Sequence, residues 1–285
     1  MIYFAYGSNL DSQDLRRWCA ENGHAYPLQN CLGPTWLPDH ELAFTLRSSA
    51  RNGGVLDVVH CNGRVVQGVL FEVPDDKVAA LDAKEGVPNS YQRRPVRVVS
   101  EEGREASAET YMVVEGKREA FVPPDREYVE VVARGLAEHG LDDRRMRALA
   151  KGADVPSLAP RVFAYGTLMA GERNHHHIEG HHTDTRTATV AGRLVSLGGF
   201  PGLLPPEKDS DTVRGELYTM RDFDAVLKAL DGLEGFHGAG NRYNLFNRKL
   251  ILANVGRRRV LCWCYVYNGE EGDLIESGSW RDPDR

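Results

Sequence analysis

The sequence predicts a mixed α/β fold that occurs twice, in two tandem domains. Three observations lead to this prediction: an internal repeat, a proline-containing segment between the two copies, and many short strand patterns with few helical ones. Strands and helices do not alternate in regular βαβ units, which argues against a doubly wound sheet. We therefore expect each domain to be a small, partly closed β-barrel with flanking helices.

The repeat consists of short stretches that recur in the same order at nearly equal spacing. The stretches of the first copy are 2–10, 69–73, 81–86 and 91–93, and their counterparts are 162–168, 215–219, 230–235 and 243–245. Such a long period is typical of a duplicated domain and not of a short-repeat solenoid. Residues 151–160 are rich in small residues and proline, so we predict domains at 1–150 and 161–285 joined by this linker.

Apolar periodicity and end signals predict the elements of each domain. The expected helices are Ser12–Ala20, Asp76–Lys84, Glu172–His177 and Asp222–Leu233. The expected strands are Val65–Val73, Pro95–Val99, Glu109–Val114, Val213–Tyr218, Arg248–Leu252 and Val260–Tyr267. The first domain also carries a tail that begins with Pro124 and Asp125, where we expect one helix followed by a shorter one around Met146 to Leu149.

Composition excludes several classes of partner. The 41 acidic and 35 basic residues give a net charge of −6, which argues against nucleic acid or an anionic membrane as the main partner. No apolar stretch approaches the roughly 20 residues of a membrane-spanning helix, and we see no secretion signal. Five scattered cysteines without a C-x-x-C pair are typical of free thiols, so we expect a cytoplasmic protein.

Two matching turns place small and polar residues directly after a strand. The first is Tyr6-Gly7-Ser8-Asn9-Leu10, and the second is Tyr165-Gly166-Thr167-Leu168. Glycine there allows backbone angles that other residues avoid, and unpaired amides at such a turn bind anions or stabilise an oxyanion. The tyrosine and glycine persist while their neighbours change, which favours a functional turn in each domain.

Glu85 and Glu234 each stand at the end of a predicted helix, before a glycine suited to a left-handed cap. A carboxylate there faces the negative end of the helix dipole, and an aspartate three residues earlier adds a like charge. Both effects raise a carboxyl pKa, as a glutamate that moves protons near neutral pH requires. The alternative interpretation is a structural ion pair with Arg93 or Arg242.

Two other kinds of site, a metal site and a serine hydrolase site, have weaker support in the sequence. The histidine-rich segment 174–182 lacks a third ligand at metal-site spacing and has no counterpart in the first half, so we interpret it as a solvated helix start and predict no metal site. Ser8 lacks the sequence around a hydrolase nucleophile, and no histidine recurs in both halves to act as its base.

Taken in order, these motifs resemble the γ-glutamyl cyclotransferases. The first half is similar to the γ-glutamylcyclotransferase branch that contains the butirosin-biosynthesis enzyme, on the stretches 6–10, 52–57, 68–72, 81–86 and 123–141. The second half resembles the γ-glutamylamine cyclotransferase, avirulence-induced-gene-like branch, on the stretches 165–168, 171–175, 198–202, 230–235 and 277–280.

The resemblance implies a reaction without water, metal or organic cofactor. The α-amine of a γ-glutamyl amide attacks its own γ-carbonyl, closes the lactam 5-oxoproline and releases an amine or amino acid. It also implies that Glu85 and Glu234 move the proton, and that a small-molecule substrate binds at the two turns. The implied binding residues are Tyr6, Gly7, Ser8, Asn9 and Leu10, with Tyr128 closing the pocket, and Tyr165, Gly166, Thr167 and Leu168.

Two other functions fit the same residues. In the first, one or both domains bind γ-glutamyl or similar amides without converting them. In the second, an external amine attacks in place of the substrate's own α-amine, and the γ-glutamyl group is transferred to it. A free amino acid, an isopeptide lysine, a polyamine and a natural product are all compatible leaving groups.

Overall fold

The computed structural model describes residues 1–282, so the last three residues of the expected second domain lie outside the described part. Contacts between residues divide the chain into two units, Met1–Leu158 and Ala159–Arg285. The expected linker belongs largely to the first unit, because Ser157 Oγ donates to the Gly63 carbonyl at 2.8 Å and Arg64 Nη1 donates to the Val155 carbonyl at 3.1 Å.

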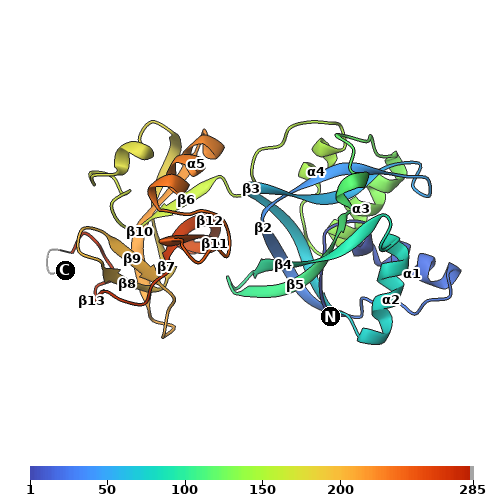
Figure 1. The fold of residues 1–285 in the computed structure, drawn as a ribbon, viewed down its shortest axis with the longest axis horizontal. Helices are drawn as coiled ribbons and strands as arrows, with labels where there is room; N and C mark the ends of the chain where they lie inside the picture. The colour runs from blue at the N-terminus through green and yellow to red at the C-terminus, as the bar shows by residue number, and fades with distance from the viewer. Residues whose placement is uncertain (283–285) are drawn as a thin grey trace. The chain divides into compact units, whose positions relative to one another are not determined.

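The N-terminal domain is a closed five-stranded barrel with the strand order β1-β3-β2-β4-β5. Figure 1 labels β2, β3, β4 and β5. A parallel pairing of Tyr3 with Glu109 closes the barrel, so it is complete where we predicted partial closure. Its strands are β1 (Ile2–Ala5), β2 (Asn30–Ser48), β3 (Gly53–Glu72), β4 (Tyr91–Ser100) and β5 (Glu105–Val113).

Four helices accompany this barrel and begin close to the predicted positions. They are α1 (Ser12–Glu21), α2 (Val78–Glu85), α3 (Arg126–Glu138) and α4 (Arg144–Leu149). Aspartate side chains cap two of them: Asp11 accepts from the Asp14 amide and Asp125 from the Glu127 amide. Such caps satisfy amides that have no partner within the helix, which explains why these starts are legible in the sequence.

The C-terminal domain repeats the closed barrel, with the order β10-β6-β12-β11-β7. Its strands are β6 (Arg161–Ala164), β7 (His182–Ala191), β10 (Thr212–Met220), β11 (Phe246–Val255) and β12 (Arg258–Tyr267). A three-stranded sheet is added from β8 (Arg193–Ser196), β9 (Pro201–Leu204) and β13 (Asp273–Ile275), and the helix is α5 (Phe223–Leu233). The helix expected at Glu172–His177 is only a 3₁₀ turn at His175–His177.

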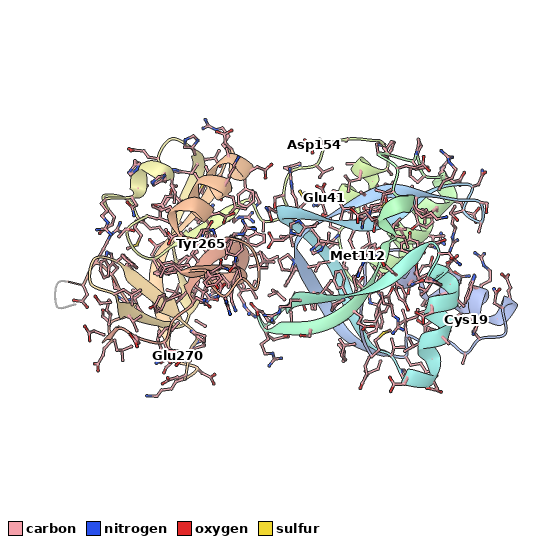
Figure 2. All side chains as sticks on the ribbon, in the orientation of Figure 1. Cys19, Glu41, Met112, Asp154, Tyr265 and Glu270 are labelled. Atoms are coloured by element: carbon pink, nitrogen blue, oxygen red, sulfur yellow. The ribbon has the colours of Figure 1, made fainter. Side chains whose placement is uncertain are left out.

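Matching glycines bring the first strand of each barrel close to its neighbour. A Cβ at Gly68 would lie 2.4 Å from the Ala5 carbonyl oxygen, and one at Gly215 would lie 2.2 Å from the Ala164 oxygen. Glycine is needed at both places because any side chain would collide with the backbone. Figure 2 shows the side chains of both domains, including Tyr265 on β12.

Within residues 1–282, no helix combines the length and the apolar character that crossing a membrane requires.

Candidate active sites

The N-terminal domain holds a pocket of about 490 Å³ where the turn after β1 meets the end of α2. Tyr6, Gly7, Ser8 and Asn9 all line it, as sequence analysis predicted. Leu10 does not, because its side chain is buried in the core and its amide donates to the Gly7 carbonyl at 3.0 Å. The pocket lining therefore gives no support to the prediction that Leu10 binds substrate.

Gly7 takes a backbone angle that we did not expect. Its φ is −125°, outside the left-handed region that favours glycine, and its ψ is −145°. A Cβ at this position would have ordinary contacts, 3.9 Å from Leu56 and from the Tyr128 hydroxyl. Both of those neighbours line the pocket, so the missing side chain leaves pocket space free. Ser8 and Asn9 open a 3₁₀ turn, whose first amides lack partners within the turn.

Glu85 lines the same pocket as this turn. It is the last residue of α2, and Gly86 follows in the left-handed conformation with φ 66°, as predicted. Asn9 Nδ2 donates to Glu85 Oε1 at 2.7 Å and to the Tyr3 hydroxyl at 3.0 Å. Burial raises the pKa of Glu85, while Lys84, the Asn9 hydrogen bond and Arg51 act in the opposite direction.

The predicted direction of this pKa shift agrees with the structure, but the aspartate that we predicted as one cause does not contribute to it. Burial dominates, and Asp82 has partners of its own: it accepts from the Tyr111 hydroxyl at 2.8 Å and pairs with Arg93 Nε at 3.2 Å. Arg93 is thus committed to Asp82 and not to Glu85. The structural ion pair that we considered as an alternative is absent from the described contacts of Glu85.

Two tyrosines complete the pocket in different ways. Tyr6 is buried and donates to the Tyr111 carbonyl at 2.6 Å, which braces the turn against β5. Tyr128, on α3, accepts a hydrogen bond from the Leu56 amide at 3.2 Å. Burial raises the pKa of Tyr128 to about 12, so the phenol keeps its proton and can donate it into the pocket.

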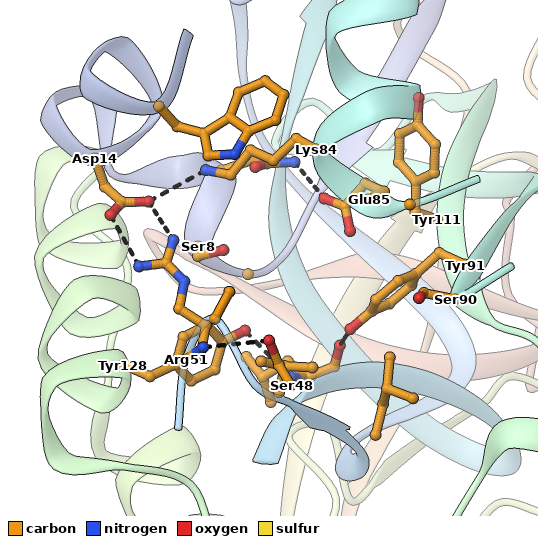
Figure 3. A pocket seen from close by; sticks show the side chains of 18 of the residues that line it. Ser8, Asp14, Ser48, Arg51, Lys84, Glu85, Ser90, Tyr91, Tyr111 and Tyr128 are labelled. Atoms are coloured by element: carbon orange, nitrogen blue, oxygen red, sulfur yellow. Dashed lines mark hydrogen bonds and ion pairs between the residues drawn. The ribbon is translucent and has the colours of Figure 1, made fainter. Parts of the chain in front are cut away.

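A charged wall that sequence analysis missed stands beside the turn (Figure 3). Asp14 is buried and accepts hydrogen bonds from Arg51 Nη1 at 3.0 Å, Lys84 Nζ at 3.1 Å and Arg17 Nη2 at 2.9 Å. Burial opposes ionisation of Asp14, but the Arg51 and Lys84 interactions outweigh it and lower its pKa to about 2. Asp14 and Arg17 are three residues apart on α1, but Arg51 and Lys84 come from two other segments, so no sequence signal joined all four.

The C-terminal domain holds a smaller pocket of about 220 Å³ at the corresponding place. It contains every residue predicted for this site, namely Tyr165, Gly166, Thr167, Leu168 and Glu234. The walls are mostly apolar and aromatic, from Phe200, Pro201, Leu233, Leu245 and Phe246.

Glu234 follows α5 directly, and Gly235 takes a φ of 62°. Burial alone raises the pKa of Glu234 to about 7. Among the described residues none donates a hydrogen bond to its carboxylate, and Arg242 contacts Tyr243 instead. The neighbouring Asp231 is paired with Arg248 and accepts from the Tyr265 hydroxyl at 2.7 Å, so it does not cause the shift.

The second turn is braced like the first but packed more tightly. Tyr165 donates to the Tyr265 carbonyl at 2.6 Å and accepts from the Leu203 amide at 3.2 Å. Asn174 Nδ2 donates to Thr167 Oγ1 at 3.0 Å. A Cβ at Gly166 would lie only 2.4 Å from Pro201 Cγ, so glycine is required here by space.

The histidine-rich segment contributes Asn174 to the lining of this pocket, but none of its histidines. His175 Nδ1 lies 3.0 Å from the Leu168 carbonyl. Within residues 1–282, no three His, Cys, Asp or Glu side chains are grouped as a metal site.

A family model for γ-glutamyl cyclotransferase, AIG2-like proteins matches residues 3–130 and again residues 162–282. The chain belongs to this family. Both copies of the domain are included, so the tandem arrangement inferred from the repeat is confirmed.

Similar proteins carry related names. A γ-L-glutamyl-butirosin B γ-glutamyl cyclotransferase of Niallia circulans is 39% identical over 123 residues, which are 43% of this chain and 76% of that protein. The γ-glutamylcyclotransferase family protein YtfP of Escherichia coli K12 is 33% identical over 127 residues, 44% of this chain and 99% of its own. A solved structure titled γ-glutamyl cyclotransferase is 27% identical with a TM-score of 0.45, and the match covers 55% of this chain and 89% of that one.

Proposed function

We propose that the chain is a tandem γ-glutamyl cyclotransferase that converts γ-glutamyl amides into 5-oxoproline and a free amine or amino acid. One observation carries this proposal: in each of two pockets, a carboxyl group with a raised pKa faces a Tyr-Gly turn. Family membership gives the general reaction, and the geometry suggests how each domain performs it.

In the proposed mechanism the substrate supplies its own nucleophile. The neutral α-amine attacks the γ-carbonyl carbon, a new C–N bond closes the five-membered ring, and the original amide C–N bond breaks. Tethering the amine to the carbonyl replaces a bimolecular encounter, so holding the substrate in a folded shape contributes much of the acceleration. The pocket walls and the turn amides of Ser8 and Asn9 are suited to that task.

The glutamate moves the proton. Its ionised form accepts a proton from the attacking nitrogen and, once protonated, donates it to the departing nitrogen. A carboxyl group with its pKa near 7, as in Glu234, has both forms available at neutral pH. No external water or cofactor takes part in this sequence of steps. We also propose a cytoplasmic location, since all five cysteines are free thiols.

The test replaces each glutamate by glutamine, singly and together, and measures 5-oxoproline release from a panel of γ-glutamyl amides. Glutamine nearly conserves shape but cannot accept the proton, so we expect each site to lose about 10²–10⁴-fold in activity. Glu101→Gln and Glu179→Gln, at exposed positions outside both pockets, are the matched controls.

The outcomes separate the possible functions. Wild-type activity in the double variant would contradict the proton-transfer role. Tight binding of γ-glutamyl amides without 5-oxoproline would indicate a binding module. A transferred γ-glutamyl group in mass spectra would indicate attack by an external amine.

A further inference from the structure

Each pocket carries positive charge beside its turn, but the two domains provide it with different residues. The N-terminal pocket has three cations around Asp14, and the C-terminal pocket has Arg173. The proposed reaction does not use either group for proton transfer. Each group lies in the same pocket as its glutamate, where it can also contact a bound substrate.

In the N-terminal domain the charge is built into the wall. The side chain of Asp14 is 2% exposed and that of Lys84 is 7% exposed. The side-chain hydrogen bonds of Arg17, Arg51 and Lys84 all go to Asp14. Three cations share one carboxylate, which leaves this wall with an excess of positive charge. Figure 3 shows Ser8 and Tyr128 beside Arg51, so the charge adjoins the turn.

In the C-terminal domain the charge comes from the loop after the turn. Arg173 lines the pocket together with Glu234 and Thr167. The adjacent Asn174 donates through its amide to the Thr167 carbonyl at 2.9 Å, which fixes the loop against the turn. Arg173 Nη1 lies 3.5 Å from the position of a Cβ on Gly199. Within residues 1–282, no carboxylate pairs with its guanidinium.

The internal repeat shows that these arrangements are exchanged. Asp14 follows Tyr6 at the same distance in sequence as Arg173 follows Tyr165, so the arginine stands where the first domain has its central carboxylate. Lys84, directly before Glu85, is replaced by Leu233, directly before Glu234. The segment 197–202, which lines the C-terminal pocket through Phe200 and Pro201, contains no cation. The C-terminal pocket thus lacks counterparts of Asp14, Arg51 and Lys84, and its positive charge comes from Arg173.

We propose that this charge binds the α-carboxylate of the γ-glutamyl group, through Arg173 in the C-terminal site and through Arg51 and Lys84 in the N-terminal site. This inference rests on the proposed function. The α-carboxylate is the one anionic group that every γ-glutamyl amide has, whatever its leaving group, so both sites must accommodate it. A cation there also favours the neutral form of the adjacent α-amine, which is the form that attacks.

The kinetic test uses Arg173, because its guanidinium pairs with no carboxylate among residues 1–282. In a Glu85→Gln chain, only the C-terminal site turns over. We compare a γ-glutamyl amide with the 4-aminobutanoyl amide of the same amine, which lacks the α-carboxylate and cyclises to 2-pyrrolidinone. Arg173→Gln should lower kcat/KM about 10–100-fold for the first substrate, mainly through KM, and change the second little. Arg173→Lys should recover part of the loss.

The control is Arg186→Gln, which removes an arginine of β7 that pairs with Asp184 outside the pocket. It should leave both substrates unaffected. An equal fall for both substrates in Arg173→Gln, or no fall for either, would overturn the proposal.

A binding measurement separates failure of this inference from failure of the proposed function. If the C-terminal site releases no 5-oxoproline, calorimetry with 5-oxoproline and 2-pyrrolidinone still reports carboxylate recognition. The chain with intact Arg173 should bind one more 5-oxoproline than the Arg173→Gln chain, with 2-pyrrolidinone binding unchanged. Identical 5-oxoproline binding in the two chains would contradict the role of Arg173, whether or not turnover occurs.

Discussion

The two sites share a frame and differ in what touches the glutamate. In both, a buried tyrosine of the turn donates to a strand carbonyl at 2.6 Å, and a helix aspartate is neutralised by an arginine and a tyrosine. The N-terminal glutamate, Glu85, has Asn9 and a nearby lysine. The C-terminal glutamate, Glu234, has Leu168 in place of Asn9 and is shifted by burial alone.

This comparison shows that position and ionisation of the glutamate are controlled separately. The helix end and its glycine fix where the carboxylate lies in both domains. The residue three after the tyrosine, Asn9 or Leu168, then decides whether its charged form has a donor. Changing that one residue alters the pKa without altering the frame, which makes the comparison open to direct tests.

The largest expected difference concerns the leaving group. The N-terminal pocket presents Ser48, Ser49 and Ser90, whereas the C-terminal pocket presents Phe200 and Leu245. Burying an apolar group on such walls contributes about 1.5–3 kcal/mol. In chains with one active site, we expect the ratio of kcat/KM for an apolar over a polar leaving amine to be about 10–100-fold higher at the C-terminal site. Equal ratios at the two sites would mean that pocket walls do not select the amine.

The next difference concerns the turn glycines. Gly166→Ala forces a Cβ against Pro201 and should destabilise the C-terminal domain by about 1–3 kcal/mol, because a well-packed site resists an added group. Gly7→Ala meets nothing closer than 3.9 Å and should change the stability of the N-terminal domain by only about 0.5 kcal/mol. Unfolding by denaturant, followed for each domain, measures both. A larger loss for Gly7→Ala would reverse the order that the contacts predict.

A reciprocal exchange at the residue facing the glutamate should move the pH dependence. Leu168→Asn offers Glu234 a donor, lowers its pKa and shifts the acid limb of kcat/KM to lower pH. Asn9→Leu removes the donor from Glu85, raises its pKa and shifts that limb upward. We expect each shift to be about one pH unit, equivalent to about 1.4 kcal/mol. The unaltered site of each chain is the control, and shifts in the same direction would contradict the role assigned to Asn9.

The smallest expected effect is on stability. The pKa of Glu234 in the folded chain is about 7, above its ordinary value of 4.5, so folding binds a proton between these values and stability falls as pH rises through them. Glutamine at position 234 has no charge to bury. Glu234→Gln should therefore stabilise the C-terminal domain above pH 7 by on the order of 1 kcal/mol, a value that allows for solvent screening. Near pH 4 we expect no gain in stability. Glu85→Gln should gain less, since Asn9 and Lys84 already support its charge. Thermal unfolding of the unaltered chain and of both variants, near pH 4 and above pH 7, measures these differences in stability.

Local signals explain which parts of the fold were predictable. The start of α1 and the end of α2 at Glu85 agree with the sequence because a capping aspartate and a left-handed glycine mark them. Strand β2 was missed, and only the end of β3 was expected. Pro34 and Pro38 interrupt the strand pattern of β2, and the pairing of β2 with β3 shifts register at several places, so alternation does not persist along either strand.

The sequence predicted the site residues that occur in both domains, but not the residues that surround and support them. Both glutamates and both turns recur, so the repeat pointed to them. Asn9 was expected to bind through its amide, whereas its side chain also contacts Glu85. The charged wall was missed because Asp14 resembles an ordinary acidic residue in the first turn of a helix. Tertiary contacts between Asp14, Arg51 and Lys84 leave no pattern in a single sequence.

Barrel closure has a consequence for how such a chain evolves. Each barrel completes its hydrogen bonding with strands of its own copy, through one parallel pairing, Tyr3 with Glu109 and Val162 with Trp263. Neither copy borrows a strand from the other, so a gene duplication produces two self-sufficient units at once. Selection can then preserve one copy while the pocket of the other changes, and the two pocket linings do differ in charge and polarity.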